Sequence, residues 1–109
     1  MKKLVRDGRV AVVHTTNYGS GWSTWSDERY GEIMAMDKDI ALAVEEGNVE
    51  KIKEITEKKC KIEDAYLYIG SNINHLGIKW VPEGSLFEIE EYDGVETVHV
   101  IGDRNYFKA

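Results

Sequence analysis

Residues 87–101 read Phe-Glu-Ile-Glu-Glu-Tyr-Asp-Gly-Val-Glu-Thr-Val-His-Val-Ile. Apolar and polar side chains alternate on both sides of Asp93-Gly94, a dipeptide that favours a two-residue hairpin turn. The pattern predicts strands at Glu88–Tyr92 and Val95–Ile101. If Tyr92 pairs with Val95, one face of the hairpin is apolar and the other polar, as expected of a half-buried antiparallel pair. The predicted pairs are Ile89 with Val98, Phe87 with Val100, Glu88 with His99 and Glu90 with Thr97.

A second hairpin is predicted at the N-terminus. Lys3–Arg6 and Arg9–His14 are strand-like runs joined by Asp7-Gly8, which again suits a tight turn. Both faces of the second run are apolar, which is typical of a central strand. This strand leads directly into a glycine-rich loop.

Two helices are predicted in the middle of the chain. Asp37 is a suitable N-cap for a helix that runs to Glu46 and ends at Gly47. Asn48 is placed to cap a second helix through about Lys59, with an apolar stripe inward and charges in water. The segment before this helical hairpin, residues 27–36, is ambiguous, and its apolar spacing favours helix.

The remaining segments complete a single α+β domain over residues 1–109. Strands are predicted at Ala65–Gly70, at Gly77–Val81 and around Asn105–Lys108, with a loop at Ser71–Leu76 and a strand stop at Pro82. We therefore expect a small antiparallel sheet of about five to six strands, with the two-helix hairpin inserted between strands.

Composition limits the classes of function. Fourteen Lys and Arg against twenty Asp and Glu give a net charge of −6, which argues against binding of duplex nucleic acid. The chain has no apolar run long enough to span a membrane and no apolar signal core. Cys60 is the only cysteine, so a reducing, cytoplasmic location is expected, and its place in a helical pattern suggests a buried, inert thiol.

The candidate ligand site is the loop that reads Tyr-Gly-Ser-Gly-Trp-Ser-Thr-Trp at residues 18–25. Glycines allow positive φ and let backbone N–H groups approach an anion, while indole faces can stack on a flat heterocycle. The opposite interpretation is a tight bend whose tryptophans fill the core or a subunit contact, and the motif alone does not separate the two. The candidate residues are Tyr18, Gly19, Ser20, Gly21, Trp22, Ser23, Thr24 and Trp25.

Other residues suited to a nucleotide lie outside the loop. Arg29, and Arg104 with Asn105, are placed to clamp phosphates, and Trp80 to stack on a base. Ordinary surface charge and core packing are the alternatives for each. The three histidines show no metal-ligand spacing, and no acid/base pair stands out, so we predict no metal, no cofactor and no catalytic residue. His14 is expected to be a partly buried donor, and His99 to form a cross-strand ion pair with Glu88.

Two blocks together resemble a group of small phage and prophage proteins. They are Gly-x-Gly-Trp-Ser-Thr-Trp at residues 19–25 and Trp-x-Pro-x-Gly…Glu-Tyr-Asp-Gly at residues 80–94. The group is similar to the first-described anti-Thoeris sponge proteins, which sequester cyclic ADP-ribose-type signals and related cyclic nucleotides, of the kind CBASS defence uses, without cleaving them.

The resemblance implies an anti-defence binding protein in the cytoplasm of an infected bacterium. It implies a homo-oligomer, dimer or hexamer, with a cyclic nucleotide between subunits. The aromatic-glycine loop, Trp80 and the Arg104-Asn105 tip would contact that nucleotide. Glu90 stands where the family pattern leads us to expect a neutral amide, and a carboxylate there would repel a pyrophosphate.

Two alternatives remain open from the sequence. One is an enzyme that cleaves the same cyclic nucleotides, with His14 or His75 as the proton carrier. The other is an inhibitor without a small ligand, which docks on a host or defence protein through its acidic face.

Overall fold

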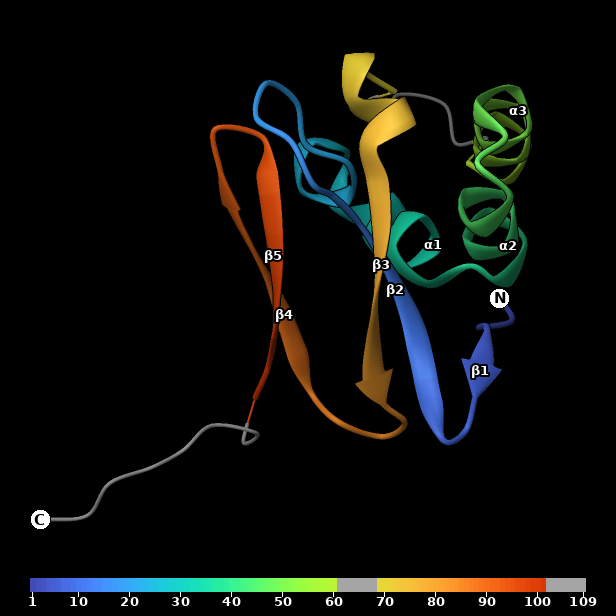
Figure 1. The fold of residues 1–109 in the computed structure, drawn as a ribbon, viewed down its shortest axis with the longest axis vertical. Helices are drawn as coiled ribbons and strands as arrows, with labels where there is room; N and C mark the ends of the chain where they lie inside the picture. Colours follow the sequence, from blue (N-terminus) through green and yellow to red (C-terminus); the bar gives the residue numbers. More distant parts are fainter. Residues whose placement is uncertain (61–68, 102–109) are drawn as a thin grey trace, which may run out of the picture.

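The computed structural model describes residues 1–60 and 69–101, with the side chain of Ser71 left out. These residues form an α+β fold with three α-helices and five strands in two antiparallel sheets. A three-stranded sheet lies between the helices α2 and α3 on one side and the hairpin β4–β5 on the other (Figure 1). The α+β class is therefore confirmed, although the strands form two sheets instead of one.

The three-stranded sheet has the order β1-β2-β3, with β1 at Val5–Arg6, β2 at Arg9–Thr15 and β3 at Leu76–Pro82. The predicted turn joins the first two strands, with φ of 51° at Asp7 and 73° at Gly8. Strand β2 is central and buried on both faces, as predicted.

The helices α2 and α3 begin at the predicted N-cap residues. The Asp37 carboxylate accepts hydrogen bonds from the backbone N–H groups of Asp39 and Ile40 and so begins α2, which Gly47 ends in the left-handed conformation. Asn48 caps α3 in the same way. The ambiguous segment before them is helical. The bounds are η2 Glu28–Tyr30, α1 Gly31–Met36, α2 Lys38–Glu46 and α3 Val49–Lys59.

The C-terminal hairpin has the predicted register throughout. Strands β4 (Phe87–Tyr92) and β5 (Val95–Val100) pair so that Phe87 lies opposite Val100 and Tyr92 opposite Val95. Its turn residues Asp93 and Gly94 have φ of 49° and 91°, the positive values that this turn demands.

Two apolar clusters hold the layers together. The larger lies between the sheet and the helices and contains Trp22, Tyr30 and Ile40, all fully buried. The smaller lies between the sheet and the hairpin and contains Val12, Val81 and Val98, with Phe87, Ile89 and Val100 packed against it. The hairpin buries its apolar face against the sheet, which explains why it packs across that sheet and does not extend it.

Four expectations need correction or lie outside the described residues. The segment predicted as loop before β3 is partly a 3-10 helix, η3, at Ser71–His75. Pro82 is the last residue of β3 instead of its stop, which a strand at a sheet edge tolerates. The predicted strand at 65–70 lies outside the described residues except for Ile69 and Gly70, which are in no strand, and the one at 105–108 lies wholly outside them.

Within the described ranges, no helix has both the length and the apolarity needed to cross a bilayer. Cys60 is buried at the end of α3, as expected. Burial, with the nearby Asp37 carboxylate, raises the pKa of the Cys60 thiol to about 11. The thiolate that a nucleophile requires is therefore scarce at neutral pH.

Candidate functional site

The glycine-rich loop is wrapped around a buried carboxylate of the protein itself. Glu96, 2% exposed, accepts hydrogen bonds at 3.0 Å from the backbone N–H groups of Thr15, Trp22 and Thr24. The Thr24 hydroxyl also donates to it. Two backbone N–H groups of the loop, those of Trp22 and Thr24, are therefore already occupied by the Glu96 carboxylate, together with the N–H of Thr15 at the end of β2.

The Trp22 ring belongs to the core. It is 1% exposed, and its indole N–H donates to the backbone carbonyl of Met34 at 2.8 Å. The expectation that this ring faces a ligand is wrong, because its apolar surface fills the cluster between sheet and helices. For Trp22, the alternative of a core tryptophan holds.

The start of the loop is fixed by η3. The side-chain amide of Asn72 donates to the carbonyl oxygens of Asn17, Tyr18 and Ser20 at 2.9 to 3.0 Å. The Ser20 hydroxyl, on a side chain 1% exposed, accepts from the Asn72 backbone N–H at 3.2 Å. Ser20 is thus a structural residue, and Ser23 is likewise buried at 7% exposure.

The other side of the loop is fixed by the β4–β5 turn. The Gly19 N–H donates to the Asp93 carbonyl at 2.7 Å, and the Thr15 hydroxyl donates to the Gly94 carbonyl. The loop and this turn consequently lie side by side at one end of the molecule (Figure 1). Gly21 is confined as well, since a Cβ there would come within 2.5 Å of the Trp25 ring.

Two aromatic residues of the loop do reach the surface. Trp25 is half-buried and donates its indole N–H to the Glu91 carboxylate at 3.0 Å. Tyr18 is 67% exposed and makes an edge contact with Tyr92 of the turn. The structure therefore divides the predicted site, with Trp22 and both serines inside and Tyr18 and Trp25 at the surface.

The charged residues predicted outside the loop are paired. Arg29 binds Asp27 through two nitrogens at 2.8 and 3.0 Å, and this hydrogen-bonded contact raises the pKa of the guanidinium. The Glu90 carboxylate lies 3.0 Å from Nε2 of His99, so the expected pairing of His99 with Glu88 must be corrected to include this diagonal neighbour. Arg104 and Asn105 lie outside the described residues.

Trp80 is half-buried on the helix side of β3. The guanidinium carbon of Arg6 lies 5.5 Å from the centre of its ring, and Arg6 also holds Glu45 through both guanidinium nitrogens at 2.6 and 2.8 Å. The Trp80 ring is thus already covered by a cation on one side.

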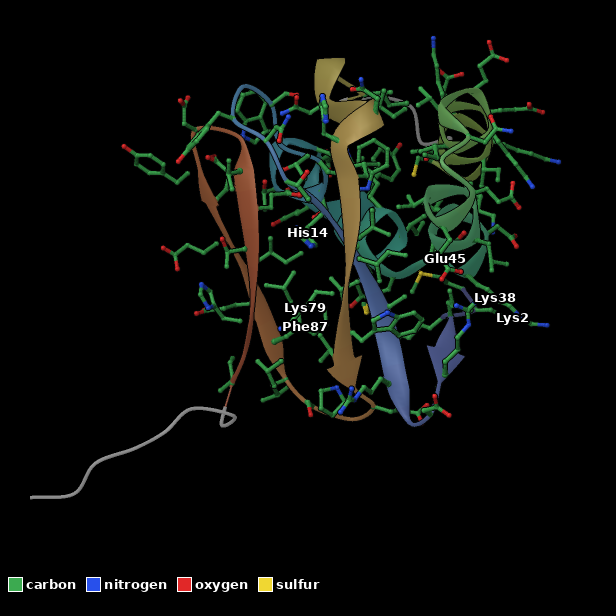
Figure 2. All side chains as sticks on the ribbon, in the orientation of Figure 1. Lys2, His14, Lys38, Glu45, Lys79 and Phe87 are labelled. Atoms are coloured by element: carbon green, nitrogen blue, oxygen red, sulfur yellow. The ribbon has the colours of Figure 1, made fainter. Side chains whose placement is uncertain are left out.

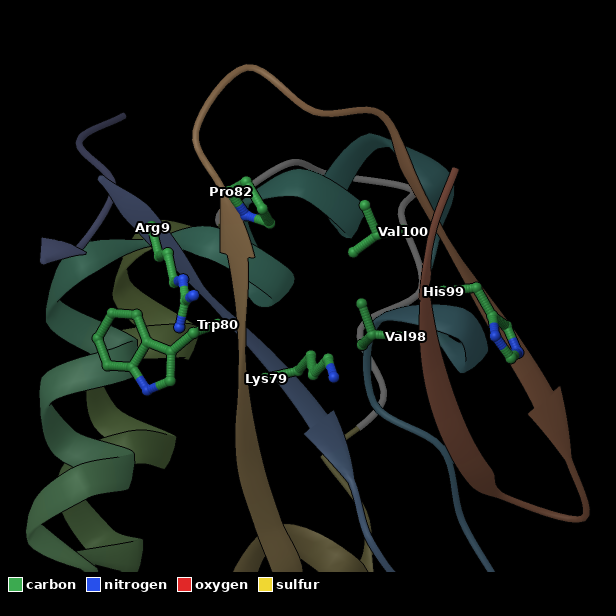
Figure 3. A pocket seen from close by; sticks show the side chains of 7 residues that line it. All are labelled: Arg9, Lys79, Trp80, Pro82, Val98, His99 and Val100. Atoms are coloured by element: carbon green, nitrogen blue, oxygen red, sulfur yellow. The ribbon is translucent and has the colours of Figure 1, made fainter. Parts of the chain in front are cut away.

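A hollow of about 350 Å³ lies along the edge of β3, between that strand and β5. Among the described strands, β3 pairs with β2 alone, so its other edge is open here. Figure 3 shows Arg9 and Trp80 on one side of β3, and Lys79, Val98 and Val100 on the other. The His99 side chain points away from this space in the same view.

Lys79 and Arg9 give this hollow its charge. Within the described part of the chain neither has a carboxylate partner, and no carboxylate lines the hollow. Four other hollows of about 290 to 420 Å³ are each lined by at least one Asp or Glu. The edge of β3 is therefore a positively charged position on a chain of net charge −6.

One of those four hollows adjoins it and shares Lys79. Figure 2 shows His14 and Lys79 in the space between β5 and β3. The Nδ1 atom of His14 lies 3.1 Å from the carbonyl oxygens of Thr15 and Glu96. Because a carbonyl oxygen only accepts, Nδ1 carries the proton and Nε2 is left as an acceptor in the neutral ring. The partly buried donor predicted for His14 is confirmed.

Sequence reasoning missed Glu96, Asn72 and Lys79. Glu96 lies on the inward face of β5, the face that also carries Val98 and Val100. A charged residue at such a position is expected to have a hydrogen-bond partner inside the protein. Lys79 is likewise in phase with the buried Val81 on the hairpin side of β3. Asn72 carries no comparable signal.

In residues 1–60 and 69–101, no three His, Cys, Asp or Glu side chains are grouped to hold a metal ion. Comparison of the chain with protein-family profiles, curated proteins and solved structures gave no match.

Proposed function

We propose that this protein binds an anionic nucleotide in the hollow beside β3 and sequesters it without cleaving it. The resemblance described above makes cyclic ADP-ribose-type signals the first class to test, followed by cyclic oligonucleotides. The proposal moves the nucleotide away from the glycine-rich loop, because Glu96 already accepts from the Trp22 and Thr24 N–H groups and the Trp22 ring is buried.

The observation that carries the proposal is that Lys79 and Arg9 line a hollow in which residues 1–60 and 69–101 supply no carboxylate partner for either cation. Phosphate groups bind arginine and lysine through charge-assisted hydrogen bonds, which are stronger than neutral ones. Among the described strands, the edge of β3 that faces away from β2 has no partner, and its N–H and C=O groups can pair with a base or a ribose hydroxyl. A volume of about 350 Å³ lies within the usual range of small-molecule sites.

Lys79→Glu tests the site. We expect this change to weaken cyclic ADP-ribose binding at least about tenfold, because a charge-assisted contact becomes a repulsive one. Lys53→Glu is the matched control. Lys53 is exposed on α3 and does not line the hollow, and its replacement changes the net charge by the same amount. Isothermal titration calorimetry measures both affinities.

The fate of the nucleotide separates binding from catalysis. Heat denaturation of the complex should release cyclic ADP-ribose unchanged, as chromatography would show. Release of a linear product would favour the cleaving enzyme. Equal binding by Lys79→Glu and the wild type would exclude this hollow, and absence of binding by the wild type to every cyclic nucleotide tested would refute the function.

We propose in addition that the protein is a homo-oligomer, dimer or hexamer, as the resemblance implies. A small domain of 109 residues buries a limited share of its surface, which favours assembly. Sedimentation velocity measures the subunit number directly, and a monomer at micromolar concentration would contradict this part of the proposal.

A further inference from the structure

We propose that the end of the molecule formed by the loop and the β4–β5 turn is a docking surface for an arginine-bearing segment of a partner protein. This surface, the aromatic tip, consists of Tyr18, Trp25, Glu91, Tyr92 and Asp93. It lies at the turn end of the hairpin, and none of these residues lines the hollow proposed for the nucleotide. The inference is therefore independent of the proposed function.

Two large aromatic side chains of the aromatic tip are exposed to solvent. Tyr18 is 67% exposed and Tyr92 is 75% exposed, among the highest exposures of large apolar side chains in the described residues. Their ring centres are 6.5 Å apart and their planes meet at 78°. The rings form an open corner of two nearly perpendicular walls, which is a geometry that receives a cation against an aromatic face.

The backbone segments that carry the two tyrosines are fixed by hydrogen bonds. The Tyr18 carbonyl accepts from Asn72, and the next residue, Gly19, donates to the carbonyl of Asp93. Tyr92 ends β4, directly before the turn. Tyrosine held in this way offers a large contact area at a small entropic cost, which is why it is favoured in binding surfaces.

Charge determines which partner fits. The Glu91 carboxylate is fixed at the turn end of the hairpin, because it accepts from the Trp25 indole at 3.0 Å and from the Gly94 N–H at 3.2 Å. Asp93 adds a second exposed carboxylate at the turn. Aromatic faces and carboxylates both attract a guanidinium, so we infer an arginine in a partner of basic charge, which complements the net charge of −6.

The probe for this inference is a synthetic peptide of alternating arginine and glycine, with a citrulline-glycine peptide of the same length as the uncharged comparison. Fluorescence anisotropy at low ionic strength measures the affinity, and amide chemical shifts locate the contact. Tyr92→Ala should weaken binding about fivefold, since one cation–aromatic contact is lost. Tyr92→Phe keeps the aromatic face and should stay within about twofold of the wild type.

Leu86→Ala is the matched control, because Leu86 is 72% exposed at the opposite end of the hairpin. Changes in amide chemical shift confined to the aromatic tip, together with the expected affinities of the Tyr92 variants, would support the inference. Equal affinity of Tyr92→Ala and the wild type, equal affinity for the citrulline peptide, or no shift in the tip would overturn it. Because Tyr92 is largely exposed, thermal unfolding should confirm that each variant remains folded.

Discussion

Replacement of Glu96 by alanine is expected to destabilise the protein by about 4 kcal/mol, because it leaves the buried N–H groups of Thr15 and Trp22 and the partly buried N–H and hydroxyl of Thr24 without their acceptor. A buried donor without a partner costs roughly 1–3 kcal/mol, and entry of water would recover part of the total. Since small domains have a total stability of about 5–15 kcal/mol, the variant should lose a large share of that stability and unfold at a clearly lower urea concentration. Urea unfolding followed by circular dichroism measures the loss.

Glu96→Gln refines this prediction. The glutamine keeps the volume of the side chain but directs an NH₂ group at one of the N–H donors, so we expect a loss of about 2 kcal/mol. Glu83→Ala removes the same charge from an exposed position and should change the unfolding midpoint little. A wild-type midpoint for Glu96→Ala would show that the loop does not depend on this carboxylate.

Replacement of Gly94 by alanine is expected to cost about 3 kcal/mol or more, because two separate penalties add. The first is conformational, since φ at this residue is 91° and a left-handed alanine costs roughly 1–2 kcal/mol. The second is steric. A Cβ at Gly94 would lie 2.9 Å from the backbone N and C atoms of Gly19, and closer still to the N atom of Ser20. These are backbone atoms, which cannot move aside as a flexible side chain does.

Gly84→Ala separates the two penalties. Gly84 has a φ of 85°, close to that of Gly94, and a Cβ there meets no atom within 4 Å. We expect Gly84→Ala to cost about 1 kcal/mol, so the difference between the variants measures the contact with the loop. If both variants lost the same stability in thermal denaturation, the close approach of turn and loop would be contradicted.

Local chemistry predicted most of the elements. The Asp-Gly turns demand positive φ, the caps Asp37 and Asn48 satisfy the first N–H groups of their helices, and the alternation in β4 and β5 permits one register that buries the apolar face. Each signal involves residues within a few positions of one another. For that reason these elements were predictable without knowledge of the remaining chain.

The candidate site was less predictable because its partners are distant in the sequence. The glycine-rich loop has the composition of an anion-binding loop, and two of its amides do bind a carboxylate, but that carboxylate is a side chain 72 to 74 residues away. A loop motif indicates which groups are available to bind. It does not show whether another segment of the same chain already uses them.

The sequence by itself determined the helices, the hairpins and their inward faces, since backbone sterics and hydrophobic periodicity act over short separations. Only the tertiary structure decided that the hairpin covers the sheet as a second layer and brings Glu96 to the loop. It also decided that Lys79 and Arg9, on opposite sides of β3, line one hollow in which no carboxylate neutralises them within the described residues (Figure 3). Charges act through space, so their partners are fixed by packing of distant segments and not by neighbours along the chain.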